Sequence, residues 1–218
     1  MSHPAVASDN GQPSNSSLAN VTNQPIALRS PQKYSGKSSS SEKFTSPPLE
    51  WLQGTWVVTH STLPMWRKAK NVRITYKIIP PSDPSKPVLL DDEVCSEPTQ
   101  KTLMPQPKSI KGIDTPAGDG AWNWRGKGLL MVASSHWEVL GWGERDAVTS
   151  DGEKVKERWV VTWFAPSLFT PAGVDLYSSR ETGMTEDTYK DIMTTLKSIG
   201  IPELVYLITK EMREVKIG

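Results

Sequence analysis

Apolar and polar residues alternate in a series of short segments between about residue 55 and residue 180. In the first, Trp56, Val58 and His60 share one face, and in the second Val72, Ile74, Tyr76 and Ile78 do the same. A period of two residues is typical of strands with one buried face. The pattern predicts strands near residues 55–60, 71–79, 88–95, 109–113, 121–125, 129–133, 136–143, 157–164 and 173–180. About eight to ten short strands with brief connections indicate an all-β fold, either an antiparallel barrel or a sandwich.

The period changes to that of a helix after residue 184. Thr185 is an expected N-cap, and Glu186 and Asp187 follow it in the first turn, where acidic side chains suit the helix dipole. Gly200 and Pro202 are expected to end this helix, and a second one is predicted from about Pro202 to Arg213. Their apolar faces are expected to pack on the outside of the β domain through Tyr189, Ile192, Met193, Leu196, Ile199, Leu204, Ile208 and Met212.

The first part of the chain has a different composition. Residues 1–47 are rich in Ser, Asn, Pro and Gln, with an uninterrupted serine run over 38–41. Such a segment buries too little apolar surface to offset its ordering entropy, so we expect a disordered tail over 1–47. The β domain with its C-terminal helices is expected over 48–218.

Charge and cysteine content narrow the possible functions. A formal net charge of +1 over 218 residues argues against a nucleic-acid surface. No apolar run reaches the length of a membrane span, and the N-terminus has no signal-peptide pattern. The single cysteine, Cys95, excludes an intrachain disulfide and fits a reducing compartment. We therefore expect a cytoplasmic protein that binds neither nucleic acid nor membrane.

Nine tryptophans lie between Trp51 and Trp163. This density favours aromatic walls around a ligand cavity, although the same side chains could instead fill the barrel. With Trp56 taken as inward, the alternation predicts a cavity lined by His60, Tyr76, Trp122, Trp124, Trp159 and Trp163.

The strand from His136 to Trp142 allows two orientations. In one, His136 and Glu138 face inward, where together with Tyr76 or Arg125 they could act as general acid and base. In the other, Trp137 and Val139 face inward and the two polar residues form a surface pair.

Metal and cofactor chemistry has little support. Three histidines and one cysteine, widely separated, do not form a zinc motif. A haem-binding barrel would need an axial histidine, for which His60 or His136 could serve, but no haem signature accompanies either. We expect neither a metal nor a cofactor.

Gly54-Thr55-Trp56, at the start of the first predicted strand, resembles the Gly-x-Trp signature of the calycins, the lipocalin and fatty-acid-binding barrel superfamily. The segments Ser61–Trp66, Trp124–Gly128 and Phe169–Gly173 are similar to lipocalin-like proteins of fungi and actinobacteria. The resemblance implies an antiparallel barrel whose floor is closed by Trp56, with Arg180 packed over the indole ring.

Together these observations predict the binding of a small hydrophobic or aromatic molecule in a barrel cavity. The alternative is an isomerase, cyclase or hydro-lyase acting on a bound secondary metabolite, since one barrel architecture can host either role. A haem-binding barrel is the third possibility.

Overall fold

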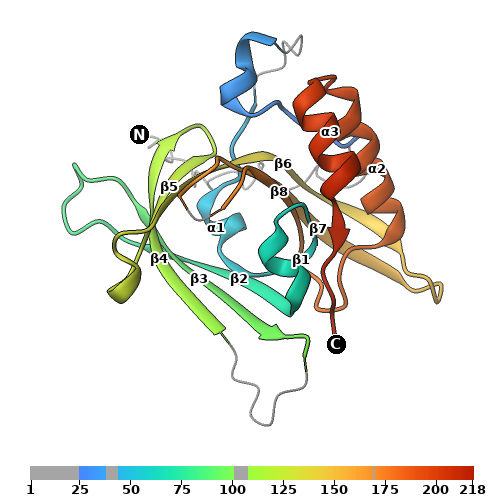
Figure 1. Cartoon of the computed structure of the whole chain (residues 1–218), viewed down its shortest axis with the longest axis horizontal. Helices are drawn as coiled ribbons and strands as arrows, with labels where there is room; N and C mark the ends of the chain where they lie inside the picture. Colours follow the sequence, from blue (N-terminus) through green and yellow to red (C-terminus); the bar gives the residue numbers. More distant parts are fainter. Residues whose placement is uncertain (1–24, 38–43, 101–107, 169) are drawn as a thin grey trace, which may run out of the picture.

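The body of the protein is a closed antiparallel barrel of eight strands, seen in Figure 1 in a computed structural model that describes residues 25–37, 44–100, 108–168 and 170–218. Sequential strands are neighbours, and the barrel closes because β1 pairs with both β2 and β8. The strands are β1 (Gly54–Ser61), β2 (Ala69–Ile79), β3 (Leu89–Pro98), β4 (Lys108–Gly118), β5 (Ala121–Gly126), β6 (Ser134–Val148), β7 (Lys154–Phe164) and β8 (Gly173–Ser178), and a short β9 (Arg213–Glu214) adds to β1. The expected all-β fold with a closed antiparallel barrel is confirmed.

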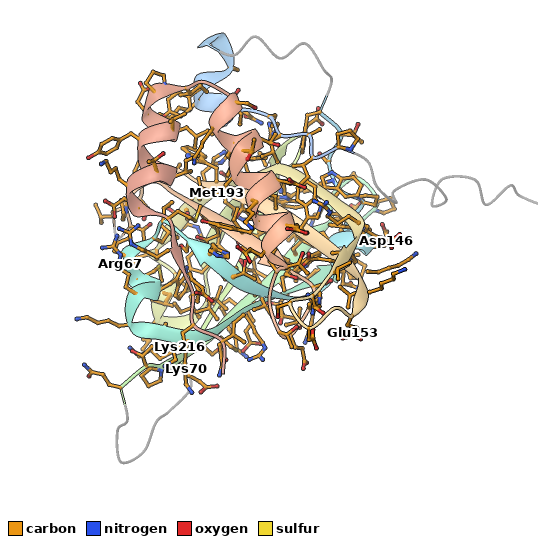
Figure 2. All side chains as sticks on the ribbon, turned by 90° about the vertical axis from the view of Figure 1, so that its right-hand side faces the viewer. Arg67, Lys70, Asp146, Glu153, Met193 and Lys216 are labelled. Atoms are coloured by element: carbon orange, nitrogen blue, oxygen red, sulfur yellow. The ribbon has the colours of Figure 1, made fainter. Side chains whose placement is uncertain are left out.

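Two C-terminal helices cover one side of the barrel. α1 (Leu49–Leu52) precedes β1, and α2 (Glu186–Ser198) and α3 (Pro202–Glu211) lie side by side outside the barrel (Figure 1). Figure 2 faces these two helices and labels Met193, whose side chain is buried beneath α2. The remaining helical turns are of the 3₁₀ type: η1 (Gln32–Lys37), η2 (Pro64–Lys68) and η3 (Gly128–Leu130).

Among the described residues, buried apolar side chains form two clusters on opposite faces of the barrel wall. The interior cluster includes Trp56, Val58, Tyr76, Trp137 and Tyr177. The outer cluster joins β7 and β8 to the predicted apolar faces of α2 and α3, as expected from their helical spacing. Strands β7 and β8 are therefore buried on both faces, because one face lines the barrel and the other lies under the helices.

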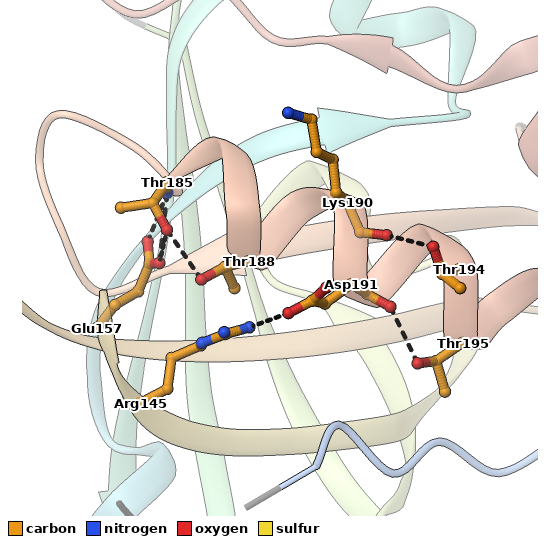
Figure 3. Close-up of polar contacts among 8 residues, drawn as sticks. All are labelled: Arg145, Glu157, Thr185, Thr188, Lys190, Asp191, Thr194 and Thr195. Carbon is orange, nitrogen blue, oxygen red and sulfur yellow. Dashed lines mark hydrogen bonds and ion pairs between the residues drawn. The ribbon is translucent and has the colours of Figure 1, made fainter. Parts of the chain in front are cut away.

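The start of α2 is attached to β7 by a buried carboxylate (Figure 3). Glu157 accepts hydrogen bonds from the Thr185 backbone N–H at 2.9 Å and the Thr185 hydroxyl at 2.7 Å, and a third from Ser178 Oγ at 3.1 Å. Thr185 is the N-cap residue, as predicted, but its side chain makes no hydrogen bond to the helix backbone. The Thr185 side chain hydrogen-bonds instead to Glu157 in the barrel wall.

The segment 25–37 packs against the outside of β6. The Arg29 backbone N–H donates to the Leu140 carbonyl at 2.8 Å, and the buried side chain of Tyr34 joins the outer cluster. A Cβ atom on Gly141 would lie 2.2 Å from Leu28 Cδ2, so this glycine allows the segment to approach the strand. These contacts differ from the unpacked tail expected over 1–47. Residues 1–24 and 38–43 lie outside the described residues, so their predicted disorder and the expected domain boundary stay predictions.

The strand predicted over 129–133 is wrong. This stretch forms η3 and a loop between β5 and β6, in which Leu129 is fully exposed and Val132 is 84% exposed. Gly128 adopts a φ of +59°, which turns the chain out of β5. An apolar run of this length does not by itself distinguish a buried strand from an exposed loop.

In the parts of the chain that the structure describes, none of the helices has the length and apolar character needed to cross a bilayer.

Candidate functional site

Four buried polar side chains meet inside the barrel, and we call them the acid–tyrosine cluster. Tyr76 comes from β2, Asp92 from β3, Asp114 from β4 and Tyr177 from β8, and each is at least about nine-tenths buried. Alternation along each strand places them on the same side as the apolar interior. Buried charged groups need partners or a proton, so the contacts of this cluster determine its chemistry.

The two carboxyl groups interact directly. Asp92 pairs in register with Gly112, and Asp114 pairs with Leu90, so the two aspartates lie diagonally on one face of neighbouring strands. They lie close enough to interact, since the Asp114 carboxyl raises the pKa of Asp92. Trp137 Nε1 on β6 donates to Asp114 Oδ1 at 2.8 Å.

Gly112 makes room for an aromatic ring beside this pair. A Cβ atom at this position would lie 2.1 Å from Trp124 Nε1 and 2.2 Å from Trp124 Cε2. The indole ring of Trp124 therefore covers the glycine, which is the register partner of Asp92. A substitution of Gly112 by any larger residue would displace the ring.

Burial keeps this cluster protonated near neutral pH. It raises the pKa of Asp114 to about 7, while the hydrogen bond from Trp137 opposes that rise. The pKa of Asp92 is raised well above its ordinary value by burial and by the neighbouring Asp114 carboxyl. Burial likewise raises the pKa values of Tyr76 and Tyr177, so both phenols stay neutral.

Three polar atoms of the cluster have no hydrogen-bond partner among the described residues. They are Asp92 Oδ1, Asp114 Oδ2 and the Tyr177 hydroxyl. An unsatisfied buried polar atom costs about 1–3 kcal/mol, so native proteins rarely keep several of them together. A bound polar group would satisfy these atoms.

Aromatic rings form the wall next to the carboxyl pair. The Trp137 ring centroid lies 5.4 Å from that of Tyr76 and 6.0 Å from that of Trp122, both in stacked orientation. Tyr76, Trp122 and Trp124 therefore lie on the interior side, as predicted. Their role in ligand binding stays a prediction.

A third buried acid, Asp175, lies two residues before Tyr177 on β8 and faces η2. Asp175 Oδ1 accepts a hydrogen bond of 2.5 Å from Ser61 Oγ, and its Oδ2 lies 3.4 Å from Trp66 Nε1. Both carboxyl oxygens thus have donors, and the group ties the η2 turn to the barrel wall.

The structure places His60 outside the barrel, so the predicted inward position is wrong. A β-bulge between Val58 and His60 shifts the register with β8 and reverses the alternation. The imidazole stacks on Tyr189 of α2, with ring centroids 3.9 Å apart. Burial there lowers the pKa of His60 to about 4.

The predicted inward positions of Trp159 and Trp163 are also wrong. Both side chains belong to the outer cluster beneath the helices, and it is Val160, between them in the alternation, that lies in the interior. Both faces of β7 are apolar, so alternation alone could not show which face lines the barrel.

Strand β6 adopts the second of its two predicted orientations, with Trp137 and Val139 inward. Glu138 is on the outer face but is only 1% exposed, because segment 25–37 covers it. It accepts a hydrogen bond from the Gln32 N–H at 3.0 Å and pairs with Arg29 at 3.3 Å. His136 hydrogen-bonds to Asn123 at 2.8 Å.

Arg125, the last catalytic candidate, donates to the Met131 carbonyl on the surface. The structure therefore separates His136, Glu138 and Arg125 from Tyr76.

Arg158, not Arg180, packs over the tryptophans at the barrel floor. Its guanidinium carbon lies 4.3 Å from the Trp51 ring centroid and 4.9 Å from that of Trp56, and it also hydrogen-bonds to the Trp51 carbonyl. Arg180 instead donates to Thr182 Oγ1 at 3.0 Å. Arg180 was expected at the end of the last strand, over Trp56. β8 ends at Ser178, so Arg180 lies beyond the strand.

We expect Arg158→Ala to lower the free energy of unfolding by about 1–2 kcal/mol, because the cation–π contacts and one hydrogen bond are lost. Arg180→Ala is the matched control and should change it by less than about 0.5 kcal/mol. Urea denaturation followed by tryptophan fluorescence measures both. Equal effects of the two variants would contradict the assignment of Arg158 to the barrel floor.

The sequence reading missed Asp92, Asp114, Asp175 and Tyr177. The sequence contained a signal for Asp92, since it lies on the same face of its strand as the apolar residues Leu90 and Val94. A search of each predicted strand for polar residues on its apolar face would have identified Asp92 as a site candidate. Within the described ranges, no three His, Cys, Asp or Glu side chains lie where they could hold a metal ion together.

Comparisons with known proteins give a related sequence and similar solved structures. No family model matches the chain. Botcinic acid biosynthesis cluster B protein 12 of Botryotinia fuckeliana (strain B05.10) is 30% identical over 195 residues, which cover 84% of this chain and 80% of that protein. Among solved structures, apocrustacyanin C1 is similar with a TM-score of 0.46 and 13% identity, over 76% of this chain and 77% of that chain.

Proposed function

Because the chain belongs to the family of botcinic acid biosynthesis cluster B protein 12, we propose that it binds a small hydrophobic or aromatic molecule of secondary metabolism inside its barrel. We further propose that it does so in the cytoplasm and without a cofactor. The free thiol of Cys95 is in keeping with a reducing compartment.

The observation that carries this proposal is the set of three unpartnered polar atoms in the barrel interior. They are surrounded by aromatic and aliphatic side chains of the interior cluster. An apolar wall with a few convergent polar groups is the usual composition of a small-molecule site. The apolar wall would supply affinity, and the Tyr177 hydroxyl and the carboxyl oxygens would orient a hydroxyl or carbonyl group of the ligand.

The test uses β-naphthol as a probe, since it combines a flat aromatic body with one hydroxyl group. We expect isothermal titration calorimetry of the full chain to give a micromolar dissociation constant. Tyr177→Phe removes only the unpartnered hydroxyl, so it should weaken binding about fivefold to tenfold, the equivalent of one hydrogen bond. It should leave folding stability unchanged or slightly higher.

Tyr189→Phe is the matched control, because Tyr189 stacks on His60 outside the barrel. It should leave the affinity for β-naphthol unchanged. If the wild-type protein fails to bind, the interior is filled by its own side chains and the proposal is wrong. A Soret band in the visible spectrum of the purified protein would contradict the absence of a cofactor.

A further inference from the structure

We propose that a cleft on the outer wall of the barrel binds an apolar molecule that carries a carboxylate group. The cleft lies over β4, β5 and β6, which are neighbours in the wall (Figure 1), and has a volume of about 800 Å³. A volume of this order is typical of small-molecule sites. The inference goes beyond the proposed binding inside the barrel, because it assigns a second site with a ligand of its own.

The floor of the cleft follows from the register of these three strands. Trp122 on β5 and Trp137 on β6 are register partners that face the interior, so alternation turns their neighbours on each strand outward. Pairing across the strands arranges the outward side chains in two adjacent rows, one of Thr115, Asn123 and His136 and the other of Ile113, Arg125 and Ser134. All six residues line the cleft.

Two loops form the walls of the cleft and expose apolar side chains at its edge. The loop after η3 contributes Val132, which is 84% exposed, and the loop after β7 contributes Leu168, which is 92% exposed. Ala165 and Pro166 add apolar surface between the floor and Leu168. A ligand seated between the loops would remove this surface from water, which favours a ligand with an apolar body.

Arg125 gives the cleft its preference for a negative charge. One guanidinium N–H of Arg125 donates to the Met131 carbonyl at 2.8 Å, which holds the side chain against the loop that follows η3. The ion pairs among the described residues do not include Arg125, so its other N–H groups are available to a ligand. A guanidinium held in this way can bind both oxygens of a carboxylate with little further loss of side-chain freedom.

The remaining polar lining also favours an anion. His136 Nδ1 donates to Asn123 Oδ1 at 2.8 Å, because this oxygen can only accept, and the Asn123 amide keeps two N–H donors. Of the described residues that line the cleft, none is Asp or Glu. Glu138 Oε1 lies 3.6 Å from His136 Nε2, but this carboxylate is 1% exposed and is paired with Arg29 at 3.3 Å. A carboxylate, which only accepts hydrogen bonds, therefore fits the donors of the floor.

A second cleft of similar size differs in its charges. It has a volume of about 770 Å³ and is lined by Arg180 together with the acidic residues Asp151, Glu153, Glu186 and Asp187. Repulsion by these carboxylates disfavours a bound carboxylate beside Arg180. Since both arginines are surface residues that line a cleft of this size, Arg180 serves as the control for Arg125.

The experiment titrates the full chain with β-naphthoate, and with β-naphthamide as an uncharged probe of the same shape, by proton–nitrogen correlation NMR. We expect β-naphthoate to bind with a dissociation constant of about 0.3 mM and to shift the amide signals of the two rows. β-Naphthamide should bind at least about fivefold more weakly, because it lacks the charge. Arg125→Gln should weaken β-naphthoate binding about tenfold, and Arg180→Gln should leave it unchanged. Leu168→Ser should weaken both probes about threefold, because it reduces the apolar wall and keeps Arg125.

The location and the charge dependence of binding can each overturn the inference. Signal shifts confined to interior residues such as Tyr177, or displacement of β-naphthoate by β-naphthol, would place the acid inside the barrel. Equal affinities for the acid and the amide, or equal effects of Arg125→Gln and Arg180→Gln, would contradict recognition of a carboxylate by Arg125. Absence of β-naphthoate binding would also overturn the inference. The proposed function would be unaffected, since β-naphthol tests the interior separately.

Discussion

Glu157→Ala is expected to lower the free energy of unfolding by about 3–4 kcal/mol, because it removes the acceptor of three buried hydrogen bonds. The Thr185 backbone N–H loses its partner, and the donors of Thr185 and Ser178 lose a charged acceptor. Since the attachment of α2 to β7 depends on this carboxylate, the helix should also open more often. Urea denaturation measures the loss of stability, and hydrogen exchange of the α2 amides measures the opening.

Glu153→Ala is the matched control for this variant, since Glu153 is exposed in the connection between β6 and β7. We expect a change of less than about 0.5 kcal/mol. The prediction fails if Glu157→Ala costs no more than the control. It also fails if exchange protection is lost equally throughout the barrel, because the effect would then not be localised at α2.

The free energy of unfolding is expected to fall as the pH rises from about 4 to about 7, in part because of Asp175. Burial raises the pKa of this carboxyl from 3.8 to about 7. Between these two values the folded protein holds a proton on Asp175 that the unfolded chain releases. Stability therefore decreases with increasing pH across this window and is independent of this group above it.

The size of the Asp175 effect follows from the pKa difference. At about 1.4 kcal/mol for each unit, it is at most about 4 kcal/mol. Asp175→Asn cannot ionise, so its stability should decline less between pH 4 and pH 7 than that of the wild type. Asp146→Asn, at an exposed position of β6, should leave the decline unchanged. Thermal unfolding at several pH values tests this, and equal slopes for wild type and Asp175→Asn would contradict it.

Alternation of apolar and polar residues predicted some side-chain positions of the candidate site correctly and others incorrectly. Alternation correctly placed Trp56, Val58, Tyr76 and Trp122 in the interior. It failed for His60, because a single bulge residue reverses every side chain after it.

Alternation also failed for Trp159 and Trp163. The strand that carries them is covered by helices that lie far from it in sequence. The sequence of a single strand contains no information about a bulge in its pairing or about the helices that cover it.

The sequence by itself determined eight of the nine predicted strands and the two C-terminal helices, because periodicities of two and 3.6 residues are local properties of the chain. Periodicity left a barrel and a sandwich open, and the resemblance to the calycins favoured the barrel. Only the tertiary structure decided which face of β7 lines the interior, which arginine covers Trp56, and that Asp92 meets Asp114. These outcomes depend on register between strands and on the covering of one sheet face by distant elements. The physical reason is that burial and pairing arise between segments, and a carboxyl group acquires its chemistry from the neighbours that folding brings to it.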